Sequence, residues 1–259
     1  MRLRRLVATS AVLIAAHPWL HAGHFFSTPN PKPTSVVIVE LFTSEGCSSC
    51  PPADTLLRQV HLRETSAGQL IVGISEHVTY WNNLGWKDPY SAQVFTDRQG
   101  VYSSRLSPEG PYTPQMIVDG RDQFVGGDAA ALERALRDDA QRPHVDLHIV
   151  SSSLSSNGID VSFSLSGQVT KPLDVVAVVT DDADRSNVLR GENSGTLLEH
   201  VSVARSLIRV ETVTGTAAKS IHLPLPDGFR PAAGSGHHLI LFAQEAHQGP
   251  IVGAAVTAL

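Results

Sequence analysis

The sequence lacks most of the signals that would assign a protein to a class at once. It has only two cysteines, no basic cluster outside its first few residues, no internal repeat and no low-complexity tract. A structural zinc site needs four Cys and His ligands at recurring spacings, so one cysteine pair without a second does not predict one. With 20 basic and 25 acidic residues the net charge is -5, which gives no reason to expect a nucleic-acid partner.

The chain also lacks an apolar run long enough to form a membrane anchor. The apolar segment from Leu6 to Ala16 is roughly half of the ~20 residues that a spanning helix needs, and three arginines precede it. This pattern is typical of a secretory signal peptide, which we expect at residues 1–22, the alternative being an N-terminal helix that is not removed. Residues 23–35 contain three prolines and are predicted to form a linker. We therefore expect an exported protein, periplasmic or secreted, with no stable membrane anchor.

The two cysteines that are present lie between a predicted strand and a predicted helix. The apolar run from Val36 to Phe42 is broken only by Glu40, which is typical of a strand covered on both faces. The two prolines that follow Cys50 lack backbone donors, so they fit only the first turn of a helix. The pattern predicts Cys47 in the loop and Cys50 at the start of that helix.

Helices and strands then alternate as far as Pro143. A second buried strand, Leu70 to Ser75, completes a βαβ unit with parallel strands and a right-handed crossover. The pair Asp88-Pro89 predicts a helix start, with Asp as N-cap and Pro as the first helical residue. Pro114 heads a short strand and is a candidate for a cis peptide bond. Asp128 is predicted to cap a last helix, which Pro143 ends.

From His144 onward the pattern changes to short strands separated by turns. Apolar residues alternate strictly with polar ones from Val145 to Ile149 and again from Ile159 to Leu165. Several short strands without helices between them predict an antiparallel β-sandwich. We place a domain boundary at about residue 143, with an α/β domain over residues 36–143 and a smaller, mostly antiparallel β-sandwich over residues 144–259.

The order of elements in the first domain resembles the thioredoxin fold. The sequence Cys47-Ser-Ser-Cys50 occupies the first strand-to-helix junction, and Thr113-Pro114 matches the cis-proline segment that lies against the CxxC motif in that family. The stretch Phe-Thr-Ser-Glu-Gly-Cys-Ser-Ser-Cys-Pro-Pro, the stretch Tyr-Thr-Pro-Gln-Met and the segment Arg190–Gly195 more narrowly resemble a family of secreted bacterial thioredoxin-like proteins of unknown function. The resemblance spans residues 36 to 259 and implies an α/β thioredoxin-like fold, but it supplies no substrate.

The cysteine pair predicts thiol–disulfide exchange on protein substrates. Such exchange needs a thiolate that attacks and a second thiol that resolves the mixed disulfide, and the two-residue spacing provides both. The fold implies that Cys47 is the nucleophile and Cys50 the resolving thiol, with the helix N-terminus lowering the thiol pKa. The expected partners are protein thiols and disulfides together with a redox partner protein, and no cofactor is predicted.

Three alternatives to this function stay open at the level of the sequence. The pair could be an inert Cys47–Cys50 disulfide, although one closing so short a loop constrains the unfolded chain little. It could instead handle Cu(I) or another soft metal ion, with His77 as a further ligand. The chain could also be a thioredoxin-like binding module without catalysis.

Glu40 is the acid that the sequence singles out, in preference to Glu45. A carboxyl group in an apolar strand has a raised pKa and could take a proton from Cys50. The alternative is that Glu40 reaches a sheet edge or pairs with a basic side chain.

Five further residues are candidates for binding the substrate. Thr113 and Pro114 are expected to shape the groove, because a cis proline presents the neighbouring backbone to an extended peptide. Tyr80, Trp81 and Trp86 are expected to form an aromatic wall beside Cys47, the alternative being positions in the core. The segment from Glu192 to Gly195 is either a simple turn or a segment that docks on the first domain.

Overall fold

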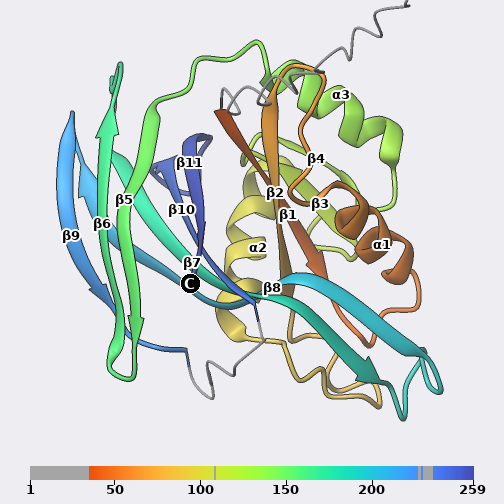
Figure 1. Cartoon of the computed structure of the whole chain (residues 1–259). Helices are drawn as coiled ribbons and strands as arrows, with labels where there is room; N and C mark the ends of the chain where they lie inside the picture. The colour runs from red at the N-terminus through yellow and green to blue at the C-terminus, as the bar shows by residue number, and fades with distance from the viewer. Residues whose placement is uncertain (1–34, 108, 227–228, 230–235) are drawn as a thin grey trace, which may run out of the picture. The chain divides into compact units, whose positions relative to one another are not determined.

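The computed structural model describes residues 35–107, 109–226, 229 and 236–259 (Figure 1). Strands greatly outnumber helices in this part of the chain, so the protein is mostly β. The predicted signal peptide and the predicted linker, apart from Ser35, lie outside the described residues. Among the helices in the described ranges, none is both long enough and apolar enough to cross a membrane.

The first half of the described chain forms the part of the sheet that carries the cysteines. Its strands are β1 (Ser35–Thr43), β2 (Gln69–His77), β3 (Gln115–Val118) and β4 (Asp122–Val125), and its helices are α1 (Pro51–Val60), α2 (Gln93–Leu106) and α3 (Ala129–Asp139). Strand β1 runs parallel to β2 and antiparallel to β3, and β3 pairs antiparallel with β4. The predicted parallel βαβ unit is thus present.

Alternate residues of β1 face two different helical layers. Val37, Val39 and Leu41 pack with side chains of α1 and α3. Ile38 and Phe42 instead pack on the side of α2. Because side chains of a strand alternate between its faces, Glu40 must share the face of Ile38 and point toward α2.

The second half of the described chain consists of strands. These are β5 (Asp146–Ser155), β6 (Gly158–Ser166), β7 (Leu173–Asn187), β8 (Leu197–Val213), β9 (Ala217–Leu223), β10 (His237–Glu245) and β11 (Ile251–Ala258). Four of them extend the sheet of the first half to the order β11-β10-β7-β8-β2-β1-β3-β4, in which β8 pairs parallel with β2 at Ser75 and Val203. One large mixed sheet therefore crosses residue 143.

The remaining strands form a separate antiparallel sheet of order β5-β6-β9. Its apolar face shares a core with β7 and β10, in which Phe163 of β6 lies in one cluster with Ala177 of β7 and Leu241 of β10. The two sheets pack face to face, as in the predicted β-sandwich. One of these two sheets, however, is the continuation of the sheet that carries the cysteines.

Two of the predicted helix starts are confirmed and one is wrong. The two prolines after Cys50 do occupy the first turn of α1, and Asp128 caps α3 by accepting a hydrogen bond from the amide of Ala131 at 2.9 Å. Helix α2 begins at Gln93 rather than after Asp88. The carboxylate of Asp88 cannot cap it, because His77 and backbone amides outside the helix occupy its oxygens.

Candidate functional site

The two cysteines form a disulfide at the start of α1. Cys50 is the N-cap residue of the helix, and the Cα atoms of the two cysteines are 5.4 Å apart. The amide of Cys47 donates to the carbonyl of Ser44 at 3.1 Å, which closes the loop before the pair. Both cysteines are buried, whereas Ser48 and Ser49 between them are exposed. The loop therefore presents its serines to solvent and keeps its sulfur atoms covered.

The predicted proline segment lies against the same helix. The Thr113–Pro114 peptide bond is cis. A Cβ atom at Gly126 would lie 2.9 Å from the Cβ of Ala53 in α1 and 3.0 Å from the Cβ of Pro114. Real Cβ contacts are longer than this, so only glycine at position 126 lets Pro114 approach the first turn of α1 so closely.

Two of the three predicted aromatic residues touch the cysteine loop or its surroundings. Trp81 donates from its indole nitrogen to the hydroxyl of Thr113 at 2.8 Å. A Cβ atom at Gly46 would lie 3.1 Å from the Cβ of Trp81. Trp86 donates to the carboxylate of Glu45 at 2.7 Å. Tyr80 is the most exposed of the three, at 40%, and donates to the side chain of Gln99.

A buried polar network lies directly behind the cysteine loop. We call it the Glu45–His200 network, and its members are Glu45, Asp54, His77, Asp88 and His200. The imidazole of His200 lies between two carboxylates, with Nε2 3.3 Å from Glu45 and Nδ1 3.8 Å from Asp54. His77 pairs with Asp88 at 2.7 Å, and the two histidine rings meet edge to face at 4.7 Å. The network thus connects the cysteine loop, α1, β2 and β8.

His200 is the cation of this network. Burial alone would lower its pKa, but the neighbouring carboxylates of Asp54 and Glu45 outweigh burial and raise the pKa to about 9. The pKa of Asp88 shifts in the opposite direction. Burial would raise it, but His77 and the backbone amides of Glu45 and Tyr90 outweigh burial and lower it. At neutral pH the site therefore holds an imidazolium ion beside buried carboxylates.

A loop from the second half of the chain covers the cysteines. We call residues 188–196, between β7 and β8, the 188–196 loop. The side-chain amide of Asn193 donates to the carbonyls of Glu45 and Cys47 at 2.8 and 3.0 Å, and the amide of Ser48 donates to Glu192 at 3.0 Å. The segment from Glu192 to Gly195 therefore docks on the first half of the chain through its first two residues.

Glycine at position 191 permits this docking. Gly191 has a φ of +80°, and a Cβ there would lie 3.3 Å from the Cβ of Trp86. Both the backbone conformation and the close approach favour glycine over any residue with a side chain.

Glu40 is not brought to the cysteine pair. It belongs to a second buried polar group, the Glu40–Arg98 cluster, whose members are Glu40, Glu76, Arg98, Tyr102 and Gln244. Glu40 forms an ion pair with Arg98 of α2 and accepts from the hydroxyl of Tyr102 at 2.7 Å. Burial, and then the charge of Glu40, raise the pKa of Glu76 well above its usual value. Of the two glutamates, Glu76 is therefore the one that holds its proton more tightly. The pairing with a basic side chain is the alternative that the sequence left open.

His77 is near the cysteine loop, but both of its ring nitrogens have partners. Nδ1 bonds to Asp88, and Nε2 lies 3.2 Å from the hydroxyl of Ser75. In this arrangement His77 has no free nitrogen for a metal ion bound by the thiols.

The sequence-based choice of site residues missed Glu45, Asp54, Asp88 and His200. Two of them had a local signal: Glu45 lies two residues before Cys47, and Asp54 lies four residues after Cys50, on the same face of α1. His200 has none, because it is 155 residues from Glu45. Asn193 was expected only as part of a segment that could dock on the first domain. The pairing of β8 with β2 brings both residues to the cysteine loop.

Comparison with known proteins places the chain in a family. The family model described as "Protein of unknown function (DUF1223)" matches residues 38–244. The X-ray crystal structure of protein AGR_C_4864 from Agrobacterium tumefaciens is similar, with a TM-score of 0.64 and 29% sequence identity over 86% of this chain and 94% of that one.

A second solved structure matches far less well. The alkylpurine DNA glycosylase AlkC of Pseudomonas fluorescens has a TM-score of 0.24 and 15% identity over 49% of this chain and 32% of that one, which is too low to bear on fold or function. A search of curated proteins gives no match. Because the family model covers most of its length, the chain belongs to the DUF1223 family.

Proposed function

We propose that the protein carries out thiol–disulfide exchange on protein substrates in an oxidising, exported compartment, with Cys47 as the nucleophile and Cys50 as the resolving thiol. The observation that carries this proposal is the Cys47–Cys50 disulfide at the N-terminus of α1, beside the cis Thr113–Pro114 bond. A disulfide is also the state that an oxidising compartment favours. The strand order β2-β1-β3-β4, with α1 between β1 and β2, fits the thioredoxin-like unit that the sequence resembles.

The exchange has two steps. A substrate thiolate attacks Sγ of Cys47, the bond between Cys47 and Cys50 breaks, and the electron pair leaves on Sγ of Cys50. A second substrate thiolate then attacks the substrate sulfur of the mixed disulfide, which releases Cys47 as a thiolate. Two substrate thiols are thereby oxidised to a disulfide while the cysteine pair is reduced, and the reverse sequence reduces a substrate disulfide.

We infer that Asp54, rather than Glu40, exchanges the proton with Cys50. Side chains four residues apart on a helix are neighbours, with Cβ atoms about 5–6 Å apart. The Oδ1 atom of Asp54 is buried and has no hydrogen-bond partner within the described part of the chain. The imidazole of His200 lies 3.8 Å from this oxygen, so Asp54 stands between the start of α1 and the Glu45–His200 network.

Substrate access requires the 188–196 loop to move. The cysteines are fully buried, and the hydrogen bonds of Glu192 to Ser48 and of Asn193 to Cys47 hold the loop on the cysteine loop. A substrate that reaches Cys47 must replace these hydrogen bonds. Thr113, Pro114 and the exposed ring of Tyr80 are the surfaces that would then bind an extended segment of the substrate.

The test is to trap the mixed disulfide. Cys50→Ser leaves Cys47 without its resolving thiol, so disulfide-linked complexes with substrate proteins should accumulate in the exported compartment. Reduction should separate them. Cys47→Ser is the matched control and should give none. If Cys50→Ser also gives none, and if the wild-type disulfide resists dithiothreitol and the reduced protein does not reduce insulin, the disulfide is structural and the proposal is wrong.

A further inference from the structure

A second group of ionisable side chains lies away from the cysteines, near the opposite end of β1. We call it the Asp119–His144 cluster; it consists of Asp119 in the turn after β3, Asp139 at the end of α3, and His144 in the link to β5. Each residue offers one ligand atom, and the three atoms lie within 4.8 Å of one another. The cluster touches β1 through the amide of Ile38, which donates to Oδ1 of Asp119 at 2.7 Å.

The two carboxylates of this cluster are buried without full sets of partners. Asp119 is 1% exposed and Asp139 0%. Within the described residues, Oδ2 of Asp119, Oδ1 of Asp139 and Nδ1 of His144 have no hydrogen-bond partner. A buried polar atom without a hydrogen-bond partner lowers the stability of the fold, so we expect these three atoms to bind a ligand.

Two arginines near the pair of carboxylates make no short contact with it, and the nearest basic group is His144 itself, 3.2 Å from Oδ2 of Asp139. Arg142 forms its short contact with Asp122, at 2.9 Å, and reaches Oδ1 of Asp139 only at 3.9 Å. The Nε atom of Arg121 donates no hydrogen bond to any described residue. Gln69 donates its amide to Asp139 at 3.0 Å, and its own Oε1 has no partner, so it adds a further neutral oxygen beside the carboxylates.

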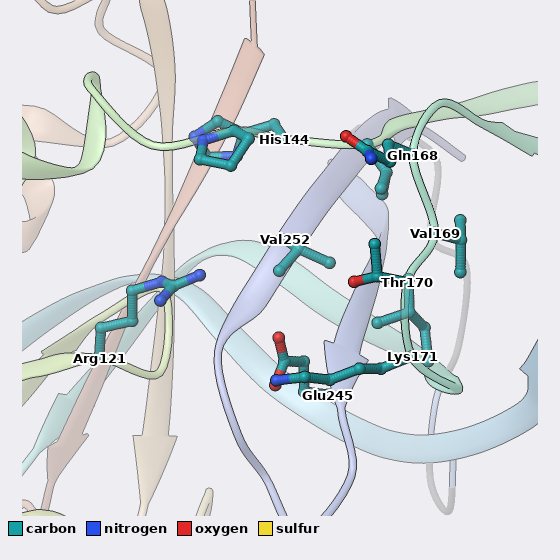
Figure 2. A pocket seen from close by; sticks show the side chains of 11 residues that line it. Arg121, His144, Gln168, Val169, Thr170, Lys171, Glu245 and Val252 are labelled. Carbon is teal, nitrogen blue, oxygen red and sulfur yellow. The ribbon is translucent and has the colours of Figure 1, made fainter.

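A cavity leads toward the cluster. It has a volume of about 190 Å³, and His144 and Arg121 border it on one side while Thr170, Lys171 and Glu245 border it on the other (Figure 2). His144 also lies 3.2 Å from Asp139, and its side chain is 15% exposed. The imidazole thus lies between the cavity and the buried carboxylates.

We propose that Asp119, Asp139 and His144 bind one divalent cation of the Zn²⁺ or Mn²⁺ kind. Two carboxylates and one imidazole suit these ions, and the absence of sulfur from the set disfavours Cu(I). Zinc bonds to such ligands at about 2.0–2.2 Å, which places the ligand atoms of a tetrahedral site roughly 3.5 Å apart, so the side chains need to close by little more than about 1 Å. The ion would join the turn after β3, the end of α3 and the first residues of the second half of the chain.

The test is calorimetric titration of the full-length, oxidised protein with ZnCl2 after treatment with a chelator, together with metal analysis of the desalted complex. One equivalent of zinc per chain should bind, and the melting temperature should rise with it. Asp119→Asn keeps the shape of the side chain and its bond to Ile38, and it should weaken zinc binding at least tenfold. His144→Ala should do the same, and because His144 is partly exposed this variant tests the site even if Asp119→Asn does not fold.

Two controls separate this site from other sources of binding. Asp122→Asn alters a neighbouring carboxylate that pairs with Arg142 outside the proposed ligand set, and it should leave zinc binding unchanged. The double variant Cys47→Ser/Cys50→Ser should also bind one equivalent, which keeps this result independent of the function proposed for the cysteines. No binding at zinc concentrations up to about 1 mM, or equal binding by wild type, Asp119→Asn and His144→Ala, would overturn the proposal.

Discussion

The Glu40–Arg98 cluster and the Glu45–His200 network both bury carboxylates beside a cation. They lie on different sides of the part of the sheet that carries the cysteines. In the first, a guanidinium that is always charged is enclosed by a carboxylate, a tyrosine and a glutamine. In the second, the cation is an imidazole whose charge depends on pH, and it lies behind a disulfide under a loop. Burial of charge therefore does not by itself mark a reactive site. The second group differs in that its cation can lose its proton and is paired with Glu45 of the cysteine loop.

The largest effect that this contrast predicts is on stability, in the Glu40–Arg98 cluster. Arg98→Met leaves Glu40 buried without its cation, and removal of one partner of a buried ion pair costs about 3–5 kcal/mol. Urea denaturation should show this loss. The rate at which dithiothreitol reduces the disulfide should stay within about twofold of wild type if the cluster is purely structural.

The double variant Glu40→Leu/Arg98→Met is the control for this prediction. It removes both charges, and replacement of a buried ion pair by apolar side chains is often nearly neutral, so most of the lost stability should return. A change in the pH profile of disulfide exchange in Glu40→Gln would contradict the structural assignment and restore Glu40 as the acid of the reaction.

A smaller effect, dependent on pH, is expected from His200. Its pKa is about 9 in the folded protein and about 6.5 in an unfolded chain. The stability that its charge contributes is therefore fully present below about pH 6.5 and is lost as pH rises through about 9, by up to roughly 3 kcal/mol. The free energy of unfolding, measured over this range of pH, should fall less steeply in His200→Gln than in wild type. Equal slopes would mean that His200 is not the cation of the network.

The smallest effect is expected from the 188–196 loop. Asn193→Ala removes two hydrogen bonds to the cysteine loop, worth about 1–2 kcal/mol together. Opening of the loop, and with it the rate of disulfide reduction by dithiothreitol, should increase roughly 5- to 30-fold. Ser194→Ala, which loses a bond within the same loop only, should leave the rate unchanged. An unchanged rate in Asn193→Ala would mean that the loop does not limit access.

The sequence predicts most of the first half of the fold because single residues there have few alternatives. Two prolines after Cys50 permit only the first turn of a helix, and Asp128 is free to cap the helix that follows it. Asp88 misleads because its carboxylate bonds to His77, a partner that local sequence does not reveal. An N-cap is predicted reliably only when no tertiary partner takes its side chain.

The choice between Glu40 and Glu45 shows the same limit in the site. Alternation along β1 fixes that Glu40 lies on one face and Val39 on the other, but not which helix covers which face. Since α1 packs on the face of Val39, the acid in the strand is directed away from the cysteines. His200 and Asn193 depend on a parallel pairing between β2 and β8 at a single pair of residues, which the hydrophobic pattern of a supposed separate domain could not indicate.

The covering loop also has a consequence for the order of events during synthesis. The side-chain amide that binds the carbonyl of Cys47 belongs to Asn193, 146 residues later in the chain, so the cysteines are made well before this loop. A chain emerging N-terminus first therefore exposes both sulfur atoms to solvent while the 188–196 loop has yet to be synthesised or folded. We expect the disulfide to form easily at that early stage, and to become difficult to reach only once the last strands have joined the sheet.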